Sequence, residues 1–166
     1  EIPVKRDWTF RQVLWLARTY SIPLDLPAAH PFNPLPLLRL AVAREASGAP
    51  NRHVCTQIFH HVWRGGASAT DGQRLDVLRA SVAPPDDPAS DAVKARLKAN
   101  TDEAINAGAF GVPTFVVDGR VFWGLDSLPM VRAAIEDDRW FRADGDWDRV
   151  LAMGVEIQRT RKESPR

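Results

Sequence analysis

The stretch GAFGVPTFVVDGRVFWGLDS, residues 108–127, holds the strongest structural signals in the sequence. Two short apolar runs, TFVV and RVFW, flank Asp118-Gly119, a pair typical of the tight turn in a β-hairpin. A Val-Pro pair precedes the first run, and the Gly-Leu-Asp-Ser after the second run is typical of a helix start. The stretch therefore predicts two paired strands followed by a helix in which either Asp126 or Ser127 is the N-cap.

The chain on both sides of this hairpin is predicted to be helical. Apolar side chains at a helical period mark a first helix around residues 10–20. Polar caps and glycine stops bound the next ones. These helices are predicted from the cap Asn33, with Pro34 at the first helical position, to Gly48; from Asn51 to Arg64; from the cap Thr70 to Ser81; and from the cap Ser90 to Gly108. In the helix after the hairpin, Leu128, Val131 and Ile135 are predicted to face inward, and a last helix is predicted over residues 146–159.

Only two strands are convincing in the sequence, and both are short. A hairpin alone is marginally stable in water unless further strands or a helix cover it. Residues 114–117 are apolar on both faces, which is typical of a central strand with neighbours on both edges. Three alternatives follow: strands missed in residues 1–107, a β-α-β unit upstream of Glu1, or strands supplied by another chain.

Composition places the chain among ordinary globular proteins. Of 166 residues, 45% are hydrophobic and 26% are charged, and the net charge of +1 gives no broad electrostatic case for a nucleic-acid or membrane partner. The single cysteine, Cys55, excludes an internal disulfide and a Cys-x-x-Cys motif, and it fits a reducing, cytoplasmic location. No apolar run is long enough to span a bilayer. We expect no metal site, because His53, His60 and Cys55 lack the spacing of ligands on one helical face.

A longer stretch, GAFGVPTFVVDGRVFWGLDSLPMVRAAI, resembles the 2-hydroxychromene-2-carboxylate isomerases and the kappa-class glutathione transferases, in the DsbA-like branch of thioredoxin-like folds. Those families carry Gly-x-Phe-Gly-Val-Pro-Thr-Phe-x-Val-x-Gly-x-x-Phe-Trp-Gly-x-Asp-Arg, and the chain departs from this pattern at Ser127, where arginine is common. WTFRQVLWLARTYSIPLDLPAAHPFNPLPLLRLAVA, residues 8–43, resembles their inserted helical region. The likeness therefore extends over residues 4–136.

The resemblance implies an α/β, thioredoxin-like (DsbA-like) fold with a large helical insertion, from which the N-terminal β-α-β unit is missing in this chain. It implies a mostly helical region over residues 1–107, the C-terminal β-β-α half of the thioredoxin-like domain over residues 108–140, and a C-terminal helix with a basic tail over residues 141–166. The active serine of these families lies in a Ser-Pro-Tyr turn after the first strand. We therefore expect the catalytic serine upstream of Glu1.

The resemblance also implies a glutathione site around the hairpin. It implies a cis peptide bond between Val112 and Pro113, where the exposed backbone of Val112 pairs with glutathione as with an added strand; a trans proline at a strand start is the alternative. Gly124 and Leu125 lie along the bound peptide, with Gly124 allowing close approach of the backbone. Asp126 is expected to pair with the ammonium of the γ-glutamyl end, although an N-cap role explains it as well.

Two residues outside the hairpin have further assignments by resemblance. Lys5 lies near a basic position that reaches the glycyl carboxylate of glutathione, and a solvated charge is the alternative. Asn33 corresponds to the asparagine of the families' Phe-Pro-x-Asn pattern and is a possible catalytic residue facing the active cleft. Its role as a helix N-cap explains it without catalysis.

The activity implied by the resemblance is glutathione-dependent cis-trans isomerisation of 2-hydroxychromene-2-carboxylate, or of a related small aromatic substrate, by reversible thiolate addition in a cytoplasmic homodimer. A kappa-type glutathione transferase or peroxidase is one alternative, since it needs the same cofactor site. A non-catalytic thioredoxin-like subunit completed by a partner chain is another. A disulfide oxidoreductase needs a cysteine pair, which this sequence lacks.

Overall fold

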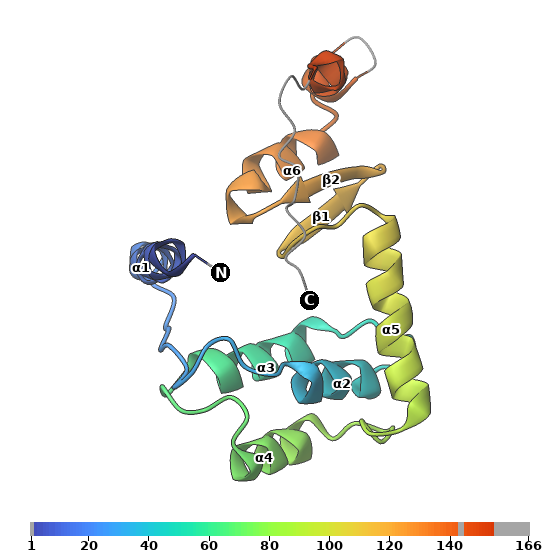
Figure 1. Ribbon diagram of the computed structural model, residues 1–166. Helices are drawn as coiled ribbons and strands as arrows, with labels where there is room; N and C mark the ends of the chain where they lie inside the picture. The colour runs from blue at the N-terminus through green and yellow to red at the C-terminus, as the bar shows by residue number, and fades with distance from the viewer. Residues whose placement is uncertain (1, 143–144, 155–166) are drawn as a thin grey trace, which may run out of the picture. The chain divides into compact units, whose positions relative to one another are not determined.

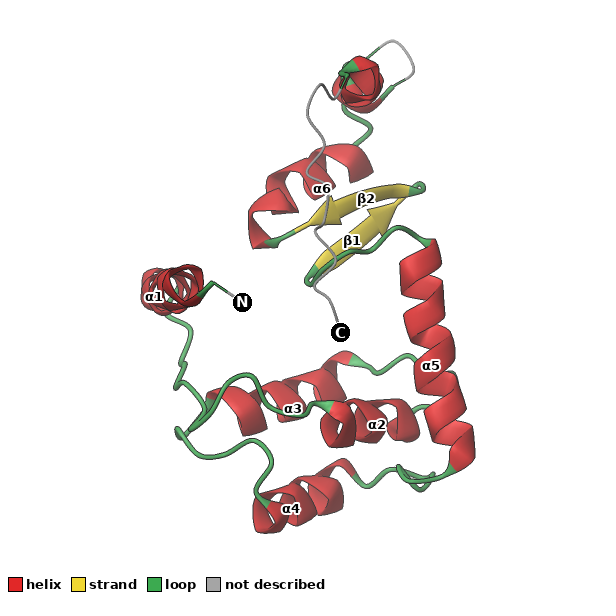
Figure 2. Ribbon diagram, in the orientation of Figure 1, coloured by secondary structure: helices red, strands yellow, loops and turns green. Residues whose placement is uncertain are grey.

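The computed structural model describes residues 2–142 and 145–154 (Figure 1). The chain divides into two compact units, Glu1–Asp102 and Glu103–Arg166, with the boundary inside one helix. Helices make up the regular structure of unit 1, whereas the two strands of the described residues both lie in unit 2 (Figure 2). None of the helices in the described part of the chain is both long enough and apolar enough to cross a membrane.

Unit 1 is a set of helices around a small apolar core. Its elements are α1 (Pro3–Thr19), α2 (Leu35–Arg44), α3 (Arg52–Trp63), α4 (Gly72–Val82) and the larger part of α5 (Asp91–Asn106). The side chains buried between α2, α3, α4 and the loop before α4 form its main cluster, which contains Leu37, Leu40, Ala41, Val54, Val62, Ala69, Leu78 and Val82. A second cluster joins Val42 and Ala43 of α2 to Val93 of α5.

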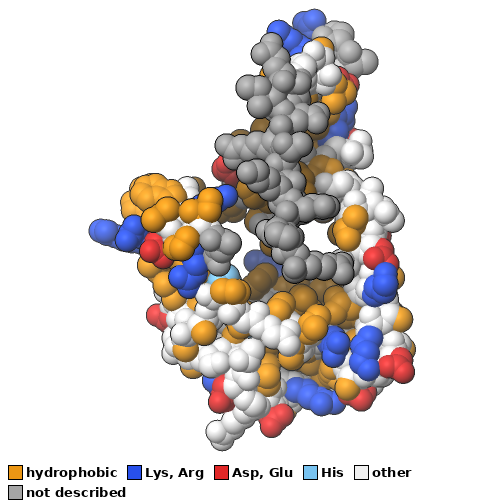
Figure 3. Space-filling model, in the orientation of Figure 1, with side chains coloured by type: hydrophobic (Ala, Val, Ile, Leu, Met, Phe, Trp, Pro, Cys, Tyr) orange, Lys and Arg blue, Asp and Glu red, His pale blue; other side chains and the backbone are white. Residues whose placement is uncertain are grey.

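Helix α1 buries little of its apolar surface in the described structure. Ala17 is its one buried residue, while Trp8 and Trp15 are 64% and 62% exposed. Hydrophobic side chains accordingly gather over α1 in the space-filling view (Figure 3). The predicted helical period around residues 10–20 is confirmed, but its apolar side chains are mostly not core residues.

The predicted cap Ser90 and the predicted helix start at Asn51 are both confirmed. Asn51 caps α3 by accepting the backbone N–H of Val54 at 3.1 Å, and Ser90 caps α5 by accepting that of Val93 at 3.3 Å. These side chains satisfy N–H groups that have no partner within the helix. The starts of both helices were therefore correctly predicted from local sequence.

The predicted cap of α4 is wrong. Asp71, rather than Thr70, accepts the N–H of Arg74 at 2.9 Å, so that the helix starts at Gly72. The backbone N–H of Thr70 instead donates to the hydroxyl of Ser68 at 3.3 Å, in the loop before the helix. A carboxylate at the cap also interacts favourably with the helix dipole, which a hydroxyl does not.

Helix α2 ends at Arg44, before the predicted stop at Gly48. Glu45 is extended, with φ -118° and ψ 127°, and its carboxylate accepts a hydrogen bond from the side chain of Asn51 at 2.5 Å. The Gly48 N–H donates a hydrogen bond to the Glu45 carbonyl at 2.8 Å. Residues 45–48 thus form a turn, and the side-chain bond between Glu45 and Asn51 spans it.

Unit 2 is built on the predicted hairpin. Strands β1 (Thr114–Val117) and β2 (Arg120–Trp123) pair antiparallel, with Thr114 opposite Trp123. Asp118 and Gly119, at φ 50° and 74°, both adopt the left-handed conformation that the tightest hairpin turns require. Within residues 2–107 the structure describes no strand, so the alternative of missed strands there is wrong.

One helix, α6 (Leu128–Ile135), packs against the hairpin after the short 3₁₀ turn η1 (Leu125–Ser127). Val131 and Ala134 are its buried residues, and they cluster with Phe122 of β2. The prediction that Leu128 and Ile135 face inward is wrong, since they are 42% and 68% exposed. The hairpin contacts only the Val131–Ala134 side of the helix, which leaves the residues beside that stripe in solvent.

The end of the described chain consists of two 3₁₀ segments, η2 (Arg139–Phe141) and η3 (Trp147–Ala152). Trp147 packs 5.3 Å from the ring of Phe122 and thereby holds η3 on the hairpin. Of the last helix predicted over residues 146–159, the structure contains this 3₁₀ segment. Residues 155–159 and the basic tail lie outside the described residues.

Candidate functional site

The segment that leads into β1 and the segment that leaves β2 lie side by side at the open end of the hairpin, opposite its turn. We call residues 110–113 and 123–126 the hairpin mouth. The Gly124 N–H donates to the Pro113 carbonyl at 2.9 Å, which continues the pairing of β1 with β2 by one step. The ring of Trp123 lies against Gly111, with its centroid 5.4 Å from that of Phe110. Backbone and aromatic contacts therefore hold the two segments together.

Val112 presents an open backbone at this mouth. Its side chain is 90% exposed, and its peptide bond to Pro113 is cis, as the resemblance implied. Neither its N–H nor its carbonyl has a hydrogen-bond partner among the residues that the structure describes. Exposed and unpaired backbone groups of this kind can bind an extended peptide in the way that a sheet edge binds a further strand.

Gly124 and Asp126 lie directly beside each other across the start of η1. Gly124 adopts φ 93°, a conformation that residues with a side chain rarely take, and a Cβ atom there would collide with the Asp126 carboxylate. Leu125 and Asp126 are both exposed. The glycine thus makes room for a carboxylate that lies against the backbone and faces solvent.

Ser127, one of the two predicted caps, does occupy the N-cap position of α6, but neither its side chain nor that of Asp126 makes a capping hydrogen bond. The short turn η1 satisfies the first N–H groups itself, since Ser127 N–H donates to Gly124 and Leu128 N–H to Leu125. The buried hydroxyl of Ser127 instead donates to the Gly124 carbonyl at 2.7 Å. Asp126 is therefore free of a capping role, and Ser127 supports the backbone beneath it.

Sequence reasoning missed three contributors to the mouth: Phe110, Gly111 and Trp123. A Cβ atom on Gly111 would overlap the indole of Trp123, and Thr114 Oγ1 donates to the Gly111 carbonyl at 2.5 Å. Phe110 and Trp123 are 75% and 53% exposed. The signal in the sequence was an aromatic residue at each end of the hairpin, since antiparallel pairing brings these two ends together.

The two other predicted site residues lie in unit 1. Lys5 is an exposed residue of α1 and lines a cavity of about 460 Å³ with Phe10 and His30. Asn33 accepts the N–H of Leu35 at 3.1 Å and thereby prepares the start of α2. This contact accounts for the asparagine structurally, and the ligand-binding and catalytic roles of Lys5 and Asn33 stay predictions.

The histidines and the cysteine have partners of their own. His61 donates from Nε2 to the Ala69 carbonyl at 2.9 Å, and His53 lies 2.6 Å from the amide of Gln57. Cys55 is a half-buried free thiol. In the part of the chain that the structure describes, no three His, Cys, Asp or Glu side chains come close enough together to hold a metal ion.

Comparison with known proteins places the chain in a family. The model of the DSBA-like thioredoxin domain matches residues 1–136. Among solved structures, a 2-hydroxychromene-2-carboxylate isomerase (HCCA isomerase) aligns with a TM-score of 0.65 and 25% identity, over 82% of this chain and 68% of that chain. No curated protein matches the sequence. The chain therefore belongs to the DSBA-like thioredoxin domain family, with a helix-rich thioredoxin-like fold that contains a small two-stranded sheet.

Proposed function

We propose that this chain acts in a glutathione-dependent isomerase whose substrate is 2-hydroxychromene-2-carboxylate or a related aromatic compound. The observation that carries the proposal is the open backbone of Val112 beside the free carboxylate of Asp126. A γ-glutamyl tripeptide needs both features, since it has an extended backbone and a charged amino end. The likeness to a solved isomerase of this type supports the reaction class.

The residues of the hairpin mouth fit glutathione by their chemistry. The Val112 N–H and carbonyl are suited to pair with the cysteinyl backbone, as in strand addition. The Asp126 carboxylate is suited to the γ-glutamyl ammonium through a charge-assisted hydrogen bond. The backbone N–H groups of Leu125 and Asp126 have no partner among the described residues and are suited to the γ-glutamyl carboxylate.

When bound, glutathione supplies a thiol whose thiolate adds reversibly to a conjugated double bond and so permits rotation about it. The roles proposed for this chain's residues are to bind and orient the peptide. Phe110 and Trp123 give the mouth exposed aromatic surface, which suits a flat aromatic substrate. Gly111 and Gly124 keep the backbone accessible, because a side chain at either position would displace Trp123 or Asp126.

Calorimetric titration with glutathione tests the binding step. We expect saturable binding by the wild-type chain and about tenfold weaker binding by Asp126→Asn, since the substitution removes a charge-assisted hydrogen bond. Cysteinylglycine, which lacks the γ-glutamyl group, is the matched ligand: it should bind weakly and equally to both variants. Equal affinity of the two variants for glutathione would remove Asp126 from the site.

The reaction is tested by assaying the chromene substrate with and without glutathione, alongside a chlorodinitrobenzene-type electrophile. Glutathione-dependent isomerisation of the chromene supports the proposal. Turnover of the electrophile alone would identify a kappa-type transferase instead. Absence of glutathione binding would contradict both activities.

A further inference from the structure

Unit 1 contains a small cavity of about 250 Å³ between α2, α4 and the loop before α5. Most of its wall is apolar and comes from Pro36, Leu40, Leu75 and Pro88, while two arginines, Arg39 and Arg79, add positive charge. The cavity lies entirely within unit 1, so no residue of the hairpin mouth takes part in it. Its volume is below the range typical of pockets for drug-sized ligands, which limits an occupant to a small molecule.

Arg39 is the unusual member of this cavity. The residue is half-buried, and its Nε atom is shielded from solvent without a hydrogen-bond partner. No ion pair or hydrogen bond joins its side chain to any residue that the structure describes. The terminal nitrogens of the Arg39 guanidinium are also unpaired within the described residues, but they are not shielded, so they are the atoms that a ligand in the cavity can reach.

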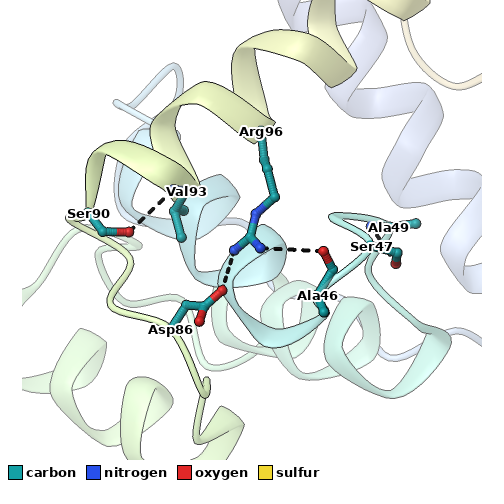
Figure 4. A network of polar contacts seen from close by, with 7 residues as sticks. All are labelled: Ala46, Ser47, Ala49, Asp86, Ser90, Val93 and Arg96. Atoms are coloured by element: carbon teal, nitrogen blue, oxygen red, sulfur yellow. Dashed lines mark hydrogen bonds and ion pairs between the residues drawn. The ribbon is translucent and has the colours of Figure 1, made fainter.

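Arg96 in the same unit shows how the chain satisfies a comparable arginine (Figure 4). Its Nε is likewise shielded and unpaired, but the end of the guanidinium is held by the Asp86 carboxylate at 2.5 Å and by the Ala46 carbonyl at 3.4 Å. Arg39 has neither kind of contact. The contrast indicates that Arg39 lacks an anionic partner rather than merely lacking one bond at Nε.

The wall of the cavity opposite α2 is fixed in place. Asp87 accepts a hydrogen bond from Arg79 at 3.2 Å and another from the Ala89 N–H at 3.1 Å. The loop is further tied to α5 through the pairing of Asp86 with Arg96. These contacts hold the loop, and Arg79 is already paired with Asp87, whereas Arg39 is unpaired among the described residues and shares the cavity lining with one carboxylate, Asp76.

We infer that this cavity binds a small organic monocarboxylate, with the carboxylate on Arg39 and the apolar body against Pro36, Leu40, Leu75 and Pro88. A guanidinium and a carboxylate match in charge and in their two-pronged geometry. Asp76, which also lines the cavity, is the competing anion within the chain, but the described residues include no ion pair between it and Arg39. The site is independent of the glutathione proposal.

Benzoate is the probe for this site, with inorganic phosphate as the comparison ion. We expect wild-type protein to bind benzoate saturably in calorimetry, and Arg39→Met to bind it about tenfold more weakly. The matched control is Arg52→Met, the same change at an exposed arginine outside the cavity, which should leave the affinity unchanged. Asp76→Asn removes the competing carboxylate and should tighten binding.

Nuclear magnetic resonance on the wild-type chain locates the site without relying on a variant that has to fold. Benzoate should shift the amide signals of Leu40, Leu75 and Ala89. The inference is overturned if benzoate does not bind, if its shifts fall at the hairpin mouth, or if Arg39→Met and wild type bind it equally. Phosphate binding as tightly as benzoate would overturn the assignment to an organic anion, because the apolar wall would then contribute nothing.

Discussion

Gly124 affects both the backbone conformation of the hairpin mouth and the position of the Asp126 carboxylate. Its positive φ of 93° disfavours any side chain, and the space where a Cβ atom would lie belongs to the Asp126 carboxylate. Gly119 in the hairpin turn has a similar φ of 74° but open space around it. An alanine at Gly119 would therefore cost conformational strain alone, whereas an alanine at Gly124 would cost that strain and also displace the Asp126 carboxylate.

Gly124→Ala and Gly119→Ala should both lower the free energy of unfolding, by about 1 kcal/mol or more, because alanine is strained at positive φ. Only Gly124→Ala should also weaken glutathione binding, since it pushes the Asp126 carboxylate out of place. Urea unfolding and calorimetric titration measure the two effects. If Gly119→Ala weakens binding as much as Gly124→Ala, the effect comes from the hairpin as a whole.

At the residue scale, the sequence points to residues that lie together but not to the contacts that support them. Gly124 and Asp126 were singled out from the pattern that follows the hairpin, and the structure brings them together. The support that Ser127 gives to Gly124 was missed, because an intervening 3₁₀ turn is not readable from residue types. Trp123 was missed for a different reason: its place against Gly111 depends on strand register.

At the scale of single elements, the start of α4 offers a direct test of capping. Asp71→Ala should lower the free energy of unfolding by about 1 kcal/mol, since it removes the acceptor for the N–H of Arg74. Thr70→Ala, one position earlier, should have almost no effect. Urea denaturation of the two variants decides between them, and a larger loss for Thr70→Ala would reinstate it as the cap.

The first turn of α5 gives a prediction for pH dependence. The hydrogen bond and charge of Lys94 hold the pKa of the Asp91 carboxyl below its ordinary value. A carboxyl with a lowered pKa in the folded state stabilises the protein above its unfolded pKa, and this contribution is lost as the pH falls through the folded pKa. Lys94→Met should therefore raise the pKa of Asp91 in a carbon-13 titration of its carboxyl. An unchanged pKa would show that Lys94 is not the cause.

Turns and helix starts that depend on neighbouring residues were predictable from the sequence. Helix ends that coincide with contacts between residues farther apart in the chain were not. The Asp118-Gly119 turn and the caps Asn51 and Ser90 lie within the segments that they define, so the sequence was sufficient there. The early end of α2 precedes a turn that is spanned by the side-chain bond between Glu45 and Asn51. Helix periodicity carries no information about such a contact.

At the scale of the whole molecule, each apolar cluster of the described core belongs to one unit only. Val54 in unit 1 and Val131 in unit 2 are both buried valines, which makes Val54→Ala and Val131→Ala a matched pair. Each should lower the stability of its own unit by about 2 kcal/mol through the cavity that it leaves. Hydrogen exchange should then speed up in α3 for the first variant and in β1, β2 and α6 for the second.

Faster hydrogen exchange in both units of either variant would contradict this independence.

The family and the thioredoxin-like fold class were predicted correctly from motifs in the hairpin and in the helical region before it, and the family model matches residues 1–136. The two predicted strands are the two that the structure describes, and the neighbours expected on the other edge stay a prediction. A strand that is apolar on both faces indicates neighbours on both edges without saying where they come from.

The hairpin has one further consequence, for how the mouth forms during folding. Thr114 pairs with Trp123 and Val117 with Arg120, so every rung of the ladder joins positions that are near each other along the chain. Closing such a short loop costs little entropy, and hairpins form within about 1–10 μs. The segments around Val112 and Asp126 can therefore become neighbours early, before contacts of high sequence separation exist, and a mutation in the distant helices should leave their pairing rate untouched.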